Sequence, residues 1–153
     1  MSTQSSIDRE SVYVRTFDAS ETGARDGICS VMRDLAGLAE VAPRLDEIQI
    51  SLAEAVNNIV EHSYANRKSG PVTIRVSFDI SVLNIEIEDE GAPFPGGGPP
   101  AGGLPPVTGV RSDLPEGGFG WFLIRRLASG VRYDRQNGKN LLNLRYMLGL
   151  DSD

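Results

Sequence analysis

A carboxylate and a carboxamide are spaced to act together in the segment Glu54-Ala55-Val56-Asn57-Asn58. Glu54 and Asn58 are at i and i+4, so on a helix they lie one above the other on the same face. There the amide oxygen can bind a hard cation such as Mg²⁺, while the carboxylate accepts a proton from an attacking oxygen. The alternative is a solvated polar face, which surface helices normally have.

A second candidate follows the alternating segment Ile85-Glu86-Ile87-Glu88, where Asp89 precedes Glu90 and Gly91. An aspartate at the end of a strand can accept a hydrogen bond from an exocyclic amine such as that of adenine. Gly91 lets the backbone turn sharply and come close to a ligand. Asp-x-Gly taken alone also describes any acidic turn.

A third candidate is the run Gly118-Phe119-Gly120 at the start of an apolar helical pattern. Glycines at the mouth of a helix expose backbone N–H groups together with the positive end of the helix dipole, which favours phosphate. The run is not a Walker A loop, because no Gly-Lys-Ser/Thr follows it, and it is not a dinucleotide fingerprint, because Leu123 stands where a third glycine would be. The alternative is a glycine-rich start to a buried helix.

Hydrophobic periodicity and turn residues predict the elements that position these candidates. Their order, β, α, α, β, β, long loop, α, β, β, predicts an α/β fold of two layers, in which helices cover one face of a mixed sheet. The predicted helices are 24–38, 44–64 and 119–129, and the predicted strands are 11–17, 72–80, 82–88, 131–134 and 141–147.

The chain has 17 glycines and 9 prolines, and most of both lie between Gly91 and Gly120. This composition cannot sustain a helix or a strand ladder, so a long loop is predicted over 92–117. Loops of that length in compact domains are usually functional lids or disordered segments. At 153 residues we expect one domain, 11–150, after a disordered N-terminus, 1–10.

Composition excludes several classes of function. The net charge is −6 and the basic residues are scattered, which argues against nucleic acid as a partner. One cysteine, Cys29, and one histidine provide neither an internal disulfide nor a Cys/His zinc site. No signal-peptide pattern occurs and no segment approaches the roughly 20 apolar residues of a membrane helix, so we expect a cytoplasmic protein that does not enter a membrane.

Together, in this order and at these separations, the three motifs resemble the N, G1 and G2 boxes of the GHKL ATPases. This Bergerat-fold superfamily includes histidine kinases, gyrase-type topoisomerases and mismatch-repair proteins. Within it, the chain is most similar to the bacterial anti-sigma-factor serine/threonine kinases, because Glu-Ala-Val-x-Asn is followed by His62 and Tyr64 and the chain is small. The resemblance covers roughly Phe17 to Met147 and implies the Bergerat ATP-binding fold.

The resemblance implies that Asn58 coordinates the Mg²⁺ that bridges the ATP phosphates and that Glu54 activates the acceptor hydroxyl. His62 either approaches the phosphates or fills the rim of its helix. Arg111 is the only basic residue between Arg75 and Gly120. We hypothesise that it swings with the lid onto the γ-phosphate, although no motif assigns it that role.

At the other motifs, the resemblance implies that Asp89 reads the adenine amine and that Gly91 lets the strand end approach the base. It also implies that Gly118, Phe119 and Gly120 lie against the phosphates at the helix N-terminus. Pro93 departs from the fuller G1 pattern, which has a second glycine at that place.

The function implied is an ATP- and Mg²⁺-dependent protein serine/threonine kinase of the partner-switching type. It would bind a sigma factor or another regulator and phosphorylate an anti-sigma-antagonist (STAS-type) protein, and it is compatible with a homodimer. The alternative is a nucleotide-binding module that sequesters its partner without transferring phosphate. The presence of both Glu54 and Asn58 favours the enzyme. A histidine kinase is disfavoured because the sole histidine, His62, lies inside the N box.

Overall fold

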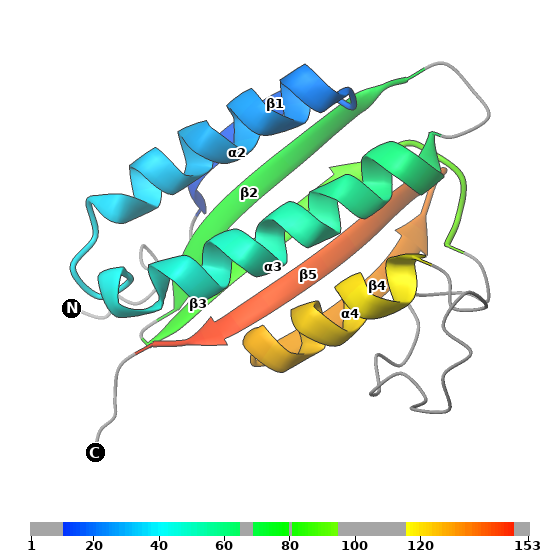
Figure 1. Cartoon of the computed structure of the whole chain (residues 1–153). Helices are drawn as coiled ribbons and strands as arrows, with labels where there is room; N and C mark the ends of the chain where they lie inside the picture. Colours follow the sequence, from blue (N-terminus) through cyan, green and yellow to red (C-terminus); the bar gives the residue numbers. More distant parts are fainter. Residues whose placement is uncertain (1–10, 65–68, 80, 95–115, 149–153) are drawn as a thin grey trace.

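The computed structural model describes residues 11–64, 69–79, 81–94 and 116–148. In these residues three α-helices lie side by side on one face of a five-stranded sheet, whose other face is uncovered (Figure 1). The predicted two-layer α/β sandwich is therefore confirmed. The N-terminus over 1–10 and most of the predicted lid lie outside the described residues.

The sheet has the strand order β1-β2-β3-β5-β4, and all four pairings are antiparallel. The prediction of a mixed sheet is wrong. Strands β3 and β4 run in the same direction, but the hairpin partner β5 lies between them and is antiparallel to both. The strands are β1 (Ser11–Asp18), β2 (Pro71–Asp79), β3 (Val82–Asp89), β4 (Gly130–Gln136) and β5 (Lys139–Met147).

The observed helices begin or end at residues other than the predicted ones. The predicted helix over 44–64 is an α-helix followed by a π-helical turn, and the helix predicted at Phe119 begins three residues earlier. No helix in the described ranges is long and apolar enough to cross a membrane. The helical elements are α2 (Glu21–Ala36), η1 (Ala42–Arg44), α3 (Leu45–Asn58), η2 (Ile59–Ser63) and α4 (Glu116–Leu127).

The core lies between the helices and the inner face of the sheet. In β3 the side chains of Leu83, Ile85 and Ile87 are buried, while the residues between them are partly exposed. This period-2 alternation is typical of a strand with one covered face. Asp89 continues the inward series, so the strand carries a carboxylate into the helix layer.

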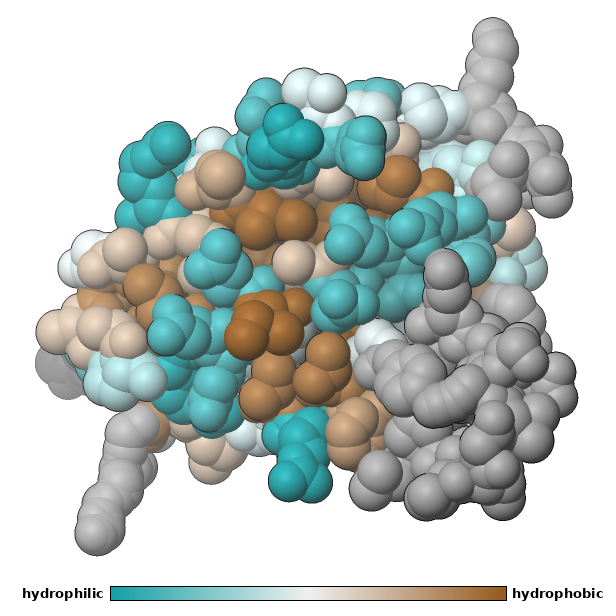
Figure 2. All heavy atoms as spheres, viewed as in Figure 1, coloured by the Kyte–Doolittle hydropathy of each residue, from teal (hydrophilic) through white to brown (hydrophobic). Residues whose placement is uncertain are grey.

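Viewed from the helix side, hydrophobic residues show between the helices, and hydrophilic residues cover much of their outer surface (Figure 2). Within the described helices, the large hydrophobic side chains that are exposed are Ile50 of α3 and Leu123 of α4. The helices therefore bury most of their apolar side chains against the sheet, as amphipathic helices do.

Arg44 joins the ends of three elements. Its Nη2 donates to Leu127 O at the end of α4, and its Nη1 donates to Met147 O at the end of β5, both at 2.8 Å. Its Nε donates to Glu47 Oε1 at 2.7 Å. Its guanidinium carbon lies 5.8 Å from the centre of the Tyr146 ring. One side chain thus fixes the C-terminal end of α4 against the beginning of α3.

We predict that Arg44→Ala lowers the free energy of unfolding by about 1–3 kcal/mol, because two carbonyl groups lose a charged donor. Urea denaturation checks this. Arg25→Ala is the matched control, since Arg25 is exposed on α2, and such surface substitutions change stability by about 0.5 kcal/mol or less. Equal stability of the two variants would contradict the assigned role of Arg44.

Candidate functional site

Glu54 and Asn58 occupy the last turn of α3, and the structure stacks them as predicted. Asn58 Nδ2 donates to Glu54 O at 2.8 Å. Asn58 is only 8% exposed, whereas Glu54 is partly exposed. A buried carboxamide is not what a plain solvated helix face would contain. The amide nitrogen of Asn58 is thus hydrogen-bonded within the helix. Its amide oxygen is the atom that can accept a hydrogen bond or bind a cation.

Helix α4 reaches this pair of side chains at Gly120. A Cβ atom at this position would lie 2.7 Å from Glu54 Oε1 and 3.4 Å from Asn58 Nδ2. A side chain at this position would therefore have to displace the Glu54 carboxylate, whereas glycine leaves it beside α4. The N-terminal part of α4 therefore lies directly beside the carboxylate and carboxamide of α3.

The predicted phosphate-binding run lies inside the first turns of α4. Gly118 is the third residue of the helix and Gly120 is the fifth. The N–H of Gly118 belongs to the first turn, where N–H groups have no partner within the helix, and that of Gly120 lies beyond it. Gly118 can thus offer a free donor, while Gly120 serves the close approach of α4. The side chain of Phe119 and the whole of Arg111 lie outside the described residues.

Beyond Asn58 the chain continues as the π-helical turn η2. The wider turn changes the direction of the following side chains, and such turns occur frequently at functional sites. The His62 side chain is 57% exposed, and its Nε2 lies 3.9 Å from Glu61 Oε1. Ser63, by contrast, is 4% exposed and faces the end of β3. Both possibilities for His62, contact with the phosphates and filling the rim of its helix, stay predictions.

Asp89 ends β3 and is 1% exposed. Its Oδ1 accepts hydrogen bonds from Gly91 N at 2.8 Å and from Asn140 Nδ2 at 2.9 Å. Its Oδ2 is also buried, yet it has no hydrogen-bond partner within the described residues. Buried polar atoms are nearly always paired, so this oxygen lacks the donor that such an atom normally has.

Burial raises the pKa of the Asp89 carboxyl above its ordinary value of 3.8. Hydrogen bonds from Asn140 and Gly91, the nearby Ser63 hydroxyl and the charge of Arg135 oppose this rise but do not cancel it. The Ser63 hydroxyl is near enough to act on the carboxylate. Neither Ser63 Oγ nor Asp89 Oδ2, however, has a hydrogen bond of proper geometry within the part of the chain that is described.

Gly91 makes its close approach to the protein itself. A Cβ atom there would lie 2.4 Å from Ser63 O and 2.6 Å from Ser63 Cβ. The next residue, Ala92, donates its N–H to Ser63 O at 2.9 Å. The missing side chain of Gly91 thus lets the chain leaving β3 pack directly against the π-helical turn. The prediction that it admits a base stays a prediction.

Three residues of the β4–β5 hairpin complete this end of the site, and sequence reasoning missed them. Asn140 Nδ2 also donates to Ala92 O at 2.9 Å, while its Oδ1 accepts from the Tyr133 hydroxyl and from Arg135 Nη1. Arg135 Nη1 donates to Gly91 O at 2.7 Å. The hairpin therefore holds the segment that follows Asp89.

An aromatic stack supports the same segment. The ring of Phe94 stacks on Tyr133 with their centres 4.5 Å apart, and its backbone N–H donates to the Tyr133 hydroxyl. Trp121 of α4 lies at a tilt against Phe94, with the ring centres 5.8 Å apart. This contact links α4 to the chain that leaves β3. Trp121 is buried, so this contact forms part of the core.

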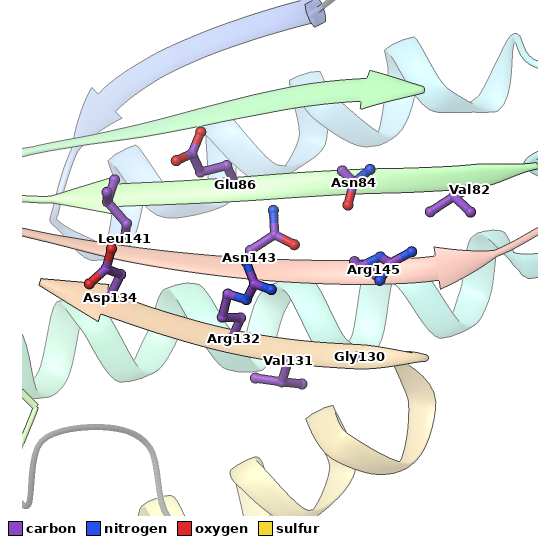
Figure 3. Close-up of a pocket in the computed structure, with 10 residues that line it drawn as sticks. All are labelled: Val82, Asn84, Glu86, Gly130, Val131, Arg132, Asp134, Leu141, Asn143 and Arg145. Carbon is purple, nitrogen blue, oxygen red and sulfur yellow. The ribbon is translucent and has the colours of Figure 1, made fainter. Parts of the chain in front are cut away.

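The hollow on the outer face of the sheet is a separate feature. Its lining includes Asn84, Glu86, Arg132, Asn143 and Arg145, which come from β3, β4 and β5 (Figure 3). These side chains lie on the side of the sheet away from the helices. None of the predicted site residues lines this hollow.

A divalent cation such as Mg²⁺ needs oxygen ligands from the side chains at this site. No group of three or more His, Cys, Asp or Glu side chains that could hold a metal ion occurs in the described residues. Mg²⁺ is commonly held by one or two protein oxygens together with phosphates and waters. The amide oxygen of Asn58 fits that requirement, and it is useful for Mg²⁺ only when phosphate oxygens supply further ligands.

The fold, the stacked Glu54 and Asn58, and the buried Asp89 at the end of β3 agree with a comparison against known families. The model of the histidine kinase-like ATPase domain matches residues 18–146. The chain belongs to this family.

Among curated proteins, the chain is 30% identical over 107 residues to the serine-protein kinase RsbW of Bacillus subtilis. It is 28% identical over 120 residues to the anti-sigma F factor of Clostridium acetobutylicum. These matches cover 69% and 78% of this chain. They span 66% of the Bacillus protein, slightly less than two thirds of its length, and 79% of the Clostridium protein.

Among solved structures, the RsbU and RsbW domains of Rv1364c from Mycobacterium tuberculosis match with a TM-score of 0.61 and 20% identity. The match covers 89% of this chain and 31% of that one. At this level of identity the similarity establishes a shared fold.

We predict that Asp89→Asn does not destabilise the protein at neutral pH. The amide keeps an acceptor for Gly91 and Asn140 and removes a buried charge. Because the pKa of Asp89 is raised in the folded state, its protonated carboxyl stabilises the folded protein below pH 3.8. This stabilisation is lost as the pH rises through the raised pKa. The melting temperature of the wild type should therefore fall relative to that of the variant over this rise.

Thermal melts between pH 3.5 and 7, in about half-unit steps, test the prediction. Asp26→Asn is the control, because Asp26 is exposed on α2. A difference between Asp89→Asn and wild type that stays constant with pH would show that the charge of Asp89 does not affect stability.

Proposed function

We propose that the chain is an ATP-dependent serine/threonine protein kinase of the anti-sigma-factor type. The observation that carries this proposal is the contact at Gly120, where the N-terminal part of α4 meets Glu54 and Asn58. A helix N-terminus that favours phosphate thus lies next to a carboxylate that can take a proton and an amide that can bind a cation.

In the proposed complex, ATP extends from the end of β3 to the start of α4. The unpartnered Asp89 Oδ2 accepts a hydrogen bond from the adenine amine. Gly118, with the first turn of α4, faces the phosphates, and Asn58 holds the Mg²⁺ that neutralises their charge. Gly91, Phe119, His62 and Arg111 remain candidate nucleotide contacts from the resemblance alone.

The proposed chemistry is the transfer of the γ-phosphoryl group to a hydroxyl of a partner protein. Glu54 accepts the hydroxyl proton as the oxygen forms its bond to the γ-phosphorus, and the bond to the β-phosphate oxygen breaks to release ADP. Such reactions depend mainly on positioning and on stabilisation of charge. The contact at Gly120 matters because it keeps the base beside the phosphate-binding turn.

The proposed partners follow from the names of the relatives. Proteins named serine-protein kinase RsbW and anti-sigma F factor suggest that this chain binds a sigma factor and phosphorylates an anti-sigma antagonist. We propose a STAS-type antagonist as the acceptor, a homodimer as the working form, and the cytoplasm as its location, where sigma factors act. Nucleic acid is not a proposed partner.

Incubation of the pure protein with labelled ATP, Mg²⁺ and the product of a neighbouring antagonist-like gene tests the proposal. We predict label on a serine or threonine of that partner. Glu54→Ala should still bind ATP but transfer phosphate about 10²–10⁴-fold more slowly, because a general base is lost. Glu21→Ala, an exposed position on α2, should transfer normally.

Two results would contradict the proposal differently. Transfer by Glu54→Ala at the wild-type rate would remove the catalytic role of Glu54. ATP binding without label on the partner, in the wild type, would favour a module that sequesters its partner without catalysis.

A second prediction concerns Gly120→Ala. Alanine favours a helix interior by about 1 kcal/mol over glycine, so the melting temperature should not fall strongly. The added Cβ must nonetheless displace the Glu54 carboxylate from its position beside α4. Misplacement of a reacting group by about 1 Å can cost about 10²-fold in rate, and we expect a loss of that order in the labelling assay.

Gly130→Ala is the matched control for this substitution, because its Cβ would meet only ordinary contacts at 3.8 Å from Arg145. Equal transfer rates for the two alanine variants would show that the close approach of α4 to α3 is not needed for transfer.

A further inference from the structure

At the end of β3, two buried polar atoms have no hydrogen-bond partner among the residues that the structure describes. They are Asp89 Oδ2 and Ser63 Oγ, in residues that are 1% and 4% exposed. Gly91 joins the two residues, because it packs against the Ser63 backbone and Cβ while its N–H donates to Asp89 Oδ1 at 2.8 Å. The Ser63 hydroxyl also lowers the pKa of the Asp89 carboxyl.

Folding stability does not explain this arrangement. A buried polar group without a hydrogen bond destabilises the folded state, and native proteins contain few of them. Ser51, the other fully buried serine of the described helical segments, shows the usual outcome. Its Oγ lies 2.6 Å from the Tyr146 hydroxyl and donates to Glu47 O at 2.8 Å. An unpaired Ser63 is therefore evidence for a ligand rather than for the fold.

The backbone around Ser63 is fixed even though its hydroxyl is unpaired. Ser63 O accepts the N–H of Ala92, and Gly91 packs against the Ser63 backbone and Cβ. Ser63 is the last residue of the π-helical turn that follows Asn58. The turn and the chain leaving β3 thus hold the hydroxyl in one place beside the carboxylate, as a binding group requires.

The two groups match one edge of adenine. An ionised carboxylate only accepts hydrogen bonds, whereas a serine hydroxyl can donate one. Adenine presents a donor, its 6-amino group, next to an acceptor, N1. This edge of the base therefore pairs with a protein acceptor that lies beside a protein donor. Guanine presents a carbonyl oxygen next to an N1–H donor, and that order would set its carbonyl against the carboxylate. Both protein atoms are enclosed, so a base reaches them only when the packing around the end of β3 opens.

We propose that Ser63 is a second base-reading residue, whose hydroxyl donates to N1 of adenine directly or through one water while Asp89 accepts from the 6-amino group. The proposal rests on the proposed function in that it takes ATP as the ligand. It adds a determinant of specificity from the π-helical turn, and it accounts for the hydroxyl that the fold leaves unpaired.

The test is a binding cycle that uses wild type and Ser63→Ala with Mg²⁺ and either ATP or 1-deaza-ATP, which lacks the N1 acceptor. Titration calorimetry of the full chain gives the four affinities. We expect the wild type to bind 1-deaza-ATP about 3- to 10-fold more weakly than ATP, the range for one neutral hydrogen bond. Ser63→Ala should bind both nucleotides equally, at about the wild-type affinity for 1-deaza-ATP.

Ser51→Ala is the matched control. It removes a paired hydroxyl, so we expect a lower melting temperature and unchanged discrimination between the two nucleotides. Ser63→Ala removes an unpaired hydroxyl, so its melting temperature without nucleotide should equal or exceed that of the wild type. This opposite pattern separates a binding role of Ser63 from a structural one.

The outcomes are distinct. If Ser63→Ala still distinguishes ATP from 1-deaza-ATP as the wild type does, the role of Ser63 is wrong while ATP binding stands. A lower melting temperature of Ser63→Ala with unchanged affinity would also overturn it and assign the hydroxyl to the fold. If the wild type binds no ATP, the proposed function itself fails. If it binds ATP and transfers no phosphate, the cycle still decides the role of Ser63.

Discussion

The site is built around one buried carboxylate, that of Asp89 at the end of β3. Asp89 is held by the N–H of Gly91 and by Asn140 of the neighbouring strand, yet only one of its oxygens has a partner within the described part of the chain. Taking a charge out of water is costly unless it is fully hydrogen-bonded. The protein therefore keeps a site that is less stable than it could be, and a ligand that donates to the free oxygen offsets this cost.

The same carboxylate explains why distant segments converge there. The π-helical turn brings Ser63 against Gly91, and the β4–β5 hairpin brings Asn140 and Arg135 to the chain leaving β3. One turn of helix separates Ser63 from Asn58, which lies beside Glu54 and α4. One short segment, from Asn58 to Ser63, thus links the base-reading end and the phosphate end of the proposed site.

Local patterns in the sequence were enough to predict the elements and the three motifs. Alternation placed Asp89 at the inner end of a strand, and the i, i+4 spacing stacked Glu54 on Asn58. The π-helical turn was not predicted, because the apolar residues continue at helical spacing through Val60. Strand order decides whether a sheet is mixed, and no local pattern shows that β5 lies between β3 and β4. Asn140 was missed because its partner, Asp89, is far away in the sequence.

A crystal structure of the chain with Mg²⁺ and a non-hydrolysable ATP analogue tests the central claim most directly. The account predicts the adenine 6-amino group within hydrogen-bond distance of Asp89 Oδ2, with the phosphates at the first turn of α4 beside Asn58. An analogue bound elsewhere, for example in the hollow lined by Arg132 and Arg145 on the outer face of the sheet, would contradict it.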